Sequence, residues 1–140
     1  MITGTSLTES EDFISKFDDK KTEADGATIW VIGALDANIR AYIGDNTTYY
    51  TPSIEGDSRI YMRNATRNTW AVKFGLRGLR NFRDKDDNIV AYKTVVEQIG
   101  GEIYNVLAPE ILDMIPLEIM SELGNEIISR NTISAVVKKK

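Results

Sequence analysis

The sequence contains no cysteine and no histidine. The absence of cysteine excludes disulfides, thiolate nucleophiles, zinc fingers and iron–sulfur ligation. The absence of histidine removes the commonest general base and the commonest transition-metal ligand. No apolar run approaches the ~18 residues of a membrane helix, and the first residues show no signal peptide. We therefore expect no cofactor, no metal and no membrane partner, and a cytoplasmically made protein that works by binding other proteins.

The composition is that of a globular domain, with 42% hydrophobic and 27% charged residues in a chain of 140. This length is enough to bury a core without disulfides. We predict an α+β fold, in which a small mixed or antiparallel sheet is packed by two to four helices and the C-terminal region is helical. Residues 1–26 are predicted to form a polar N-terminal arm with a short helix beginning at Ser10, residues 27–130 a single domain, and residues 131–140 a short basic tail.

The first half of the domain contains one clear strand. Residues 27–35 are β-branched and aromatic, which predicts a buried strand. Asp36 suits the N-cap of a short helix that stops at Gly44. We expect residues 45–58 to form a long loop that includes some strand through Tyr49-Tyr50.

The second half begins with a helical pattern. From about Ile60 to Leu79, apolar residues recur three and four positions apart, which predicts a helix. Asp84-Lys85-Asp86-Asp87-Asn88 is predicted to be a turn in which Asn88 takes a left-handed backbone. Residues 89–96 are rich in β-branched residues and predict a strand that ends before two glycines.

Two prolines mark helices near the C-terminus. Pro109 and Pro116 each suit the first turn of a helix, where a missing N–H costs no hydrogen bond. The second of these helices carries a core stripe and an acidic stripe at helical spacing, formed by Met120, Leu123 and Ile127 and by Glu118, Glu122 and Glu126.

Charge is distributed unevenly along the chain. Residues 1–62 carry a net charge of −6, residues 63–85 a net charge of +6, and residues 86–140 a net charge of −4. The basic segment is the strongest candidate for an interface, because a basic face of one copy can meet an acidic face of the next. The predicted interface residues are Arg63, Arg67, Lys73, Arg77, Arg80 and Arg83, with Trp70 as an anchor. We expect Lys73, Arg77 and Arg80 to share one helical face.

No residue stands out as catalytic or metal-binding. Asp84-x-Asp86-x-Asn88 matches the first half of a calcium loop, but Ile89 and Val95 occupy the positions of the required Gly and bidentate Glu. Gly75-Leu76-Arg77-Gly78-Leu79-Arg80 is too short for a phosphate-binding loop. The acidic pairs, such as Asp18-Asp19, lie in polar runs that would not raise a pKa. We assign no catalytic, cofactor-binding or metal-binding residue.

Three uses of the basic segment stay open: contact with another protein, a solvated helix face, and contact with nucleic-acid phosphates. Trp70 and Phe74 are interleaved with the basic residues, but their helical spacing favours a place in the core over base stacking. The acidic flanks also oppose a phosphate-binding face. Copies of the chain itself and other proteins are therefore the favoured partners, and nucleic acid the least favoured.

Several short motifs occur in order across most of residues 25–130. They are Ala27-Thr28-Ile29-Trp30 with Leu35-Asp36, Gly75-Leu76-Arg77-Gly78-Leu79-Arg80-Asn81-Phe82 with the Asp-rich turn after it, and a helix with Ile115-Pro116, Glu122-Leu123 and Glu126-Ile127. In this order they resemble small proteins encoded among the head and tail genes of tailed bacteriophages. Such proteins are structural components of the virion or assist tail assembly.

The resemblance implies a non-enzymatic structural protein of the virion, which binds neighbouring capsid, neck or tail proteins in multiple copies. In a ring of copies the basic middle would face the acidic flanks of a neighbour, and residues 1–26 would order on assembly. Two alternatives stay open: a tail-assembly chaperone absent from the mature particle, and a nucleic-acid-binding regulator that uses residues 63–85. The sequence after Ser134 lacks the longer polar extension of chaperone-like members, which favours the virion protein.

Overall fold

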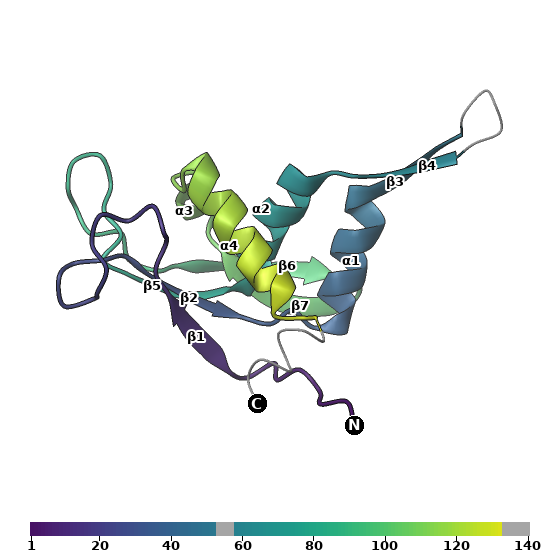
Figure 1. The fold of residues 1–140 in the computed structure, drawn as a ribbon, viewed down its shortest axis with the longest axis horizontal. Helices are drawn as coiled ribbons and strands as arrows, with labels where there is room; N and C mark the ends of the chain where they lie inside the picture. The colour runs from purple at the N-terminus through teal and green to yellow at the C-terminus, as the bar shows by residue number, and fades with distance from the viewer. Residues whose placement is uncertain (53–57, 133–140) are drawn as a thin grey trace.

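The computed structural model describes residues 1–52 and 58–132 (Figure 1). The strands are β1 (Ser10–Phe13), β2 (Ile29–Gly33), β3 (Thr48–Pro52), β4 (Ser58–Met62), β5 (Leu76–Arg80), β6 (Thr94–Ile99) and β7 (Glu102–Leu107). The helices are α1 (Ala37–Thr47), α2 (Asn64–Gly75), α3 (Pro109–Leu112) and α4 (Leu117–Ser129). Within the described residues these strands form three small antiparallel sheets. The α+β prediction, with a helical C-terminal region, is therefore confirmed.

The largest sheet has the order β1-β2-β5, with the buried strand β2 in the middle. β2 coincides with the strand predicted over residues 27–35. Phe13 of β1 pairs with Trp30, and Arg80 of β5 pairs with Ile29. The prediction of a helix beginning at Ser10 is wrong, because residues 10–13 alternate in exposure and extend the sheet along the free edge of β2.

The helix predicted from Ile60 to Leu79 is also wrong in extent. Residues 58–62 form β4, the helix runs only from Asn64 to Gly75, and the chain then continues as β5. Leu76 and Leu79 are buried, as the helical spacing implied. They lie on a strand, however, where they pair with the buried residues Ile32 and Trp30 of β2. The register of β5 against β2 shifts once, between Val31 and Ile32, so two buried residues of the strand stand three positions apart. In the sequence this spacing is the same as that of a helix.

Close packing of α2 against α4 organises the core. A Cβ on Gly75 would lie 2.6 Å from Cγ2 of Ile127, so the bare glycine backbone makes room for that side chain. Met120, Leu123 and Ile127 are buried, which confirms the predicted core stripe of α4. In Figure 1, α1, α2 and α4 lie together on one side of strands β2 and β5.

Two local predictions concern the ends of elements. Asp36 caps α1 as predicted, with its side chain accepting a hydrogen bond from the backbone N–H of Ile39 at 2.8 Å; α1 continues past Gly44 to Thr47. The turn over residues 84–88 is confirmed, since Asp84 accepts N–H bonds from Asp86 and Asn88. The left-handed residue in it is Asp87, with φ of 63°, and not Asn88.

The remaining strand prediction is displaced along the chain. The sequence predicts a strand over residues 89–96, whereas β6 begins at Thr94 and ends at Ile99. Ile89 makes an isolated bridge to Arg83, and the N–H of Val90 donates to the carbonyl of Phe82. Ile89 and Val90 thus close the loop after β5 before the β6–β7 hairpin starts.

Candidate functional site

The basic residues predicted to form one interface are spread over several elements. Arg67, Trp70 and Lys73 lie on α2, and Arg77 and Arg80 lie on β5. Lys73 lies on helix α2 whereas Arg77 and Arg80 lie on strand β5, so the prediction that the three share one helical face is wrong. Arg63 precedes α2, and Arg83 lies in the loop after β5.

Two of these cations form ion pairs with distant acidic residues of the same chain. Nε and Nη2 of Arg80 lie 2.6 Å and 2.7 Å from carboxylate oxygens of Glu23 and Asp12. These hydrogen bonds, that of Glu23 first, hold the pKa of Arg80 above its ordinary value. Nζ of Lys73 lies 2.6 Å from Glu97. Part of the basic segment is thus neutralised by the acidic flanks within one molecule.

Three other basic residues of the set, Arg67, Arg77 and Arg83, donate hydrogen bonds within the chain. Nη2 of Arg77 donates to the carbonyl of Ala34 at 2.6 Å. Nη2 of Arg67 donates to Asn125 at 3.2 Å, although its buried Nε has no partner among the described residues. Nη1 of Arg83 donates to the carbonyl of Asp87. These bonds hold neighbouring segments together, which is a structural use of the charge.

Trp70, the predicted anchor, is half-buried and stacks on Tyr42 of α1. The ring centroids lie 5.2 Å apart with 24° between the planes. The indole therefore joins α1 to α2, which is a structural role within the chain.

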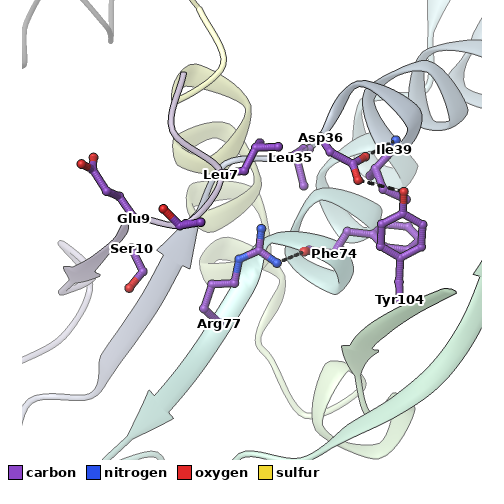
Figure 2. A pocket seen from close by; sticks show the side chains of 10 residues that line it. Leu7, Glu9, Ser10, Leu35, Asp36, Ile39, Phe74, Arg77 and Tyr104 are labelled. Atoms are coloured by element: carbon purple, nitrogen blue, oxygen red, sulfur yellow. Dashed lines mark hydrogen bonds between the residues drawn. The ribbon is translucent and has the colours of Figure 1, made fainter. Parts of the chain in front are cut away.

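A pocket of about 400 Å³ lies between the N-terminal segment and the start of α1 (Figure 2). Tyr104 donates its hydroxyl hydrogen to Asp36 at 2.8 Å and accepts a hydrogen bond from Asn38 at 3.0 Å. Desolvation is the main cause that raises the pKa of Tyr104. Arg77, which also lines the pocket, is bound to the carbonyls of Phe74 and Ala34. The pocket's main polar groups therefore serve to hold helix ends and strands in place.

Several exposed apolar side chains gather on the β3–β4 hairpin, which extends away from the helices in Figure 1. Among its described side chains, the large exposed apolar ones are Tyr49, Tyr50, Ile60, Tyr61 and Met62. Tyr50 and Ile60 face each other across the two strands and are 63% and 73% exposed. We refer to these five residues as the hairpin patch. The sequence signal for it is two aromatic, strand-forming segments on either side of polar residues. The sequence prediction placed Tyr49-Tyr50 in a loop with some strand, and Ile60, Tyr61 and Met62 at the start of a helix.

The two faces of the hairpin differ in character. On one face the rings of Tyr49 and Tyr61 stack with centroids 5.3 Å apart. The guanidinium carbon of Arg63 lies 5.4 Å from the centroid of Tyr49, so a positive charge adjoins this aromatic pair. Tyr50 and Ile60 lie on the opposite face. Of the seven predicted interface residues, Arg63 alone adjoins the hairpin patch.

A second exposed apolar surface is a groove of about 730 Å³ between the segment after β1 and α4. Phe17 and Leu117 line it and are 55% and 76% exposed. Its charged lining residues are Lys16, Glu118, Glu122 and Glu126. Glu122 accepts a hydrogen bond from the backbone N–H of Lys16 at 3.0 Å, and its other carboxylate oxygen has no partner among the described residues. We refer to this surface as the α4 groove.

No family model, no curated protein and no solved structure matches the chain. In the part of the chain that the structure describes, no three acidic side chains gather closely enough to hold a metal ion. No helix among the described residues is both long and apolar enough to cross a membrane.

Proposed function

We propose that the chain is a non-enzymatic structural protein of a tailed-phage virion, which assembles with copies of itself and with neighbouring head or tail proteins. The observation that carries the proposal is the hairpin patch on β3 and β4. Large aromatic and aliphatic side chains that gather on an exposed surface are typical of protein–protein interfaces. A projecting hairpin can also reach a neighbour without moving the body of the domain.

The structure of the hairpin favours its association with another chain. An isolated two-stranded hairpin is at best marginally stable in water. Among the described strands, β3 and β4 pair with each other alone, so each leaves one backbone edge free. Free edges and exposed apolar side chains favour association with another chain. Burial of the hairpin patch against a neighbour would remove both features from water.

The location in a virion is supported by the resemblance of residues 25–130 to small head and tail proteins of tailed phages. A role without catalysis is supported by the pocket beside Asp36, whose polar groups are engaged in bonds within the chain. A binding role also agrees with a sequence that has neither histidine nor cysteine.

Mass spectrometry of purified virions of the phage that encodes the chain tests this proposal. We expect its peptides in the washed particle at an abundance that corresponds to several copies. Their absence from virions, combined with their presence in the infected-cell lysate, would overturn the structural role and favour the tail-assembly chaperone.

A further inference from the structure

We propose that the β3–β4 hairpin of one copy docks into the α4 groove of the next, so that copies associate head to tail. This inference rests on the proposed function and names the partner surface for it. The occupant of the groove is the hairpin of a second copy of this chain.

The positions of the two surfaces favour such a contact. In Figure 1 the hairpin projects at one end of the longest axis, and the loops that follow β1 lie at the other end. The groove runs along α4, in the middle of this view and away from the hairpin. Two different surfaces on one copy can produce a heterologous association, which closes into a ring or continues as a filament.

The charges of the two surfaces are complementary. The α4 groove is lined by three glutamates and one lysine. Glu126 also lies 3.7 Å from Nη2 of Arg130, so Glu118 and Glu122 supply the negative charge that the groove presents. Arg63 brings a positive charge beside the stacked rings of Tyr49 and Tyr61. Glu118 has no ion-pair partner in the described part of the chain and lies in the first turn of α4. We pair Arg63 of one copy with Glu118 of the next.

The apolar parts are also complementary. Leu117 and Phe17 leave an apolar lining exposed at the groove, and the hairpin supplies aromatic side chains that are exposed within their own copy. A volume of about 730 Å³ is large enough to receive several side chains. In the docked hairpin, the face that carries Tyr49, Tyr61 and Arg63 meets the glutamates. Tyr50 and Ile60, on the other face of the hairpin, meet the apolar lining at Leu117 and Phe17.

A photo-crosslinking amino acid in the groove identifies its occupant directly. Benzoylphenylalanine is placed at Leu117, and, as a control of similar exposure, at Val96 of β6, which is 69% exposed. At concentrations where the chain is oligomeric, we expect the probe at Leu117 to capture the hairpin peptide of another copy, and the probe at Val96 not to capture it. Capture of the peptide that contains residues 131–140, or of no peptide at all, overturns the inference.

Charge reversal provides a second readout. Arg63→Glu and Glu118→Arg should each weaken self-association by about tenfold, because each places like charges in contact. An equimolar mixture of the two variants should recover association at the wild-type affinity, since in alternating copies every hairpin meets a groove of opposite sign. Failure of the mixture to recover, with both variants folded by circular dichroism, overturns the inference. If the wild type oligomerises and is found in virions while these tests fail, the proposed function stands and the groove assignment alone is lost.

Discussion

Gly124 of α4 packs directly against the backbone of Asn68 in α2, so that a Cβ on Gly124 would lie 2.6 Å from Cα of Asn68. This approach brings the two central helices together and lets Leu123 and Ile127 fill the core. Helix α2 in turn connects the projecting hairpin to β5, so the spacing of α2 and α4 affects both proposed surfaces.

We predict that Gly124→Ala destabilises the protein by about 1–3 kcal/mol, because the helices must separate to admit a methyl group. The better helix propensity of Ala, about 1 kcal/mol, offsets part of this cost. Gly44→Ala in α1 is the matched control, since a Cβ there meets nothing within 4 Å; it should stabilise by about 0.5–1 kcal/mol. Urea denaturation measures both, and equal effects of the two substitutions would contradict the packing described.

The Asp36 carboxylate holds two elements at once. One oxygen accepts the N–H of Ile39 at the start of α1, and the other accepts the hydroxyl of Tyr104 in β7. We predict that Asp36→Ala lowers the free energy of unfolding by about 1–2 kcal/mol through loss of the cap. Tyr104→Phe leaves the cap in place but removes the bond to Asp36 and the bond accepted from Asn38, and it should cost about 0.5–1.5 kcal/mol. A larger loss for Tyr104→Phe than for Asp36→Ala, measured by thermal unfolding, would show that the cap is not the main contribution.

Tyr92 links stability to alkaline pH. Its hydroxyl donates to the carbonyl of Leu76 at 2.7 Å, and desolvation raises its pKa above the ordinary value, against a smaller opposing effect of Arg77. Because the folded state favours the neutral phenol, its stabilising contribution is complete below about pH 10 and is lost as the pH rises through the raised pKa.

We predict that Tyr92→Phe costs about 0.5–1.5 kcal/mol at neutral pH, and that the difference from wild type shrinks above about pH 11. Guanidinium denaturation at the two pH values measures this. A difference that stays constant or grows with pH would contradict the assignment of the raised pKa to Tyr92.

The engagement of the basic residues within the chain predicts weak binding to DNA. Arg80 and Lys73 are paired with carboxylates, and the net charge of the chain is −4. We expect no specific complex with duplex DNA at physiological salt, and little change in the weak binding across a salt series. Tight binding that falls steeply with salt in a gel-shift assay would indicate several phosphate contacts and favour the regulator instead.

The features predictable from the sequence are those determined by nearby residues. The cap at Asp36, the turn at 84–88 and the core stripe of α4 each depend on residues within about one or two helical turns. The end of α2 at Gly75 could not be predicted from neighbouring residues. The chain leaves the helix there to form β5, and β5 pairs with β2, which lies about 50 positions earlier in the sequence.

The same limit applies to the candidate site. A count of charges along the chain found a basic segment, but Arg80 has its partners at Asp12 and Glu23, more than 50 residues away in sequence. The net charge of a sequence segment therefore does not show how many of its charged side chains lack an ion-pair partner in the folded chain. The strands that carry the hairpin patch could in principle be predicted from the sequence, because Tyr49-Tyr50 and Ile60-Tyr61 are strand-forming pairs. Whether such strands pack on the body or project from it depends on tertiary structure.

Self-association through the hairpin is the central claim, and light scattering coupled to size-exclusion chromatography tests it most directly. The wild type is compared over a range of concentrations with Tyr50→Ser/Ile60→Ser, which removes apolar side chains that contact little in the isolated copy. Val96→Ser is the matched control, with a similarly exposed side chain on β6. We predict that the wild type and the control form oligomers that grow with concentration, and that the hairpin variant stays monomeric while its circular dichroism spectrum is unchanged. A wild type that is monomeric at every concentration, or a hairpin variant that oligomerises as the wild type does, would contradict the account.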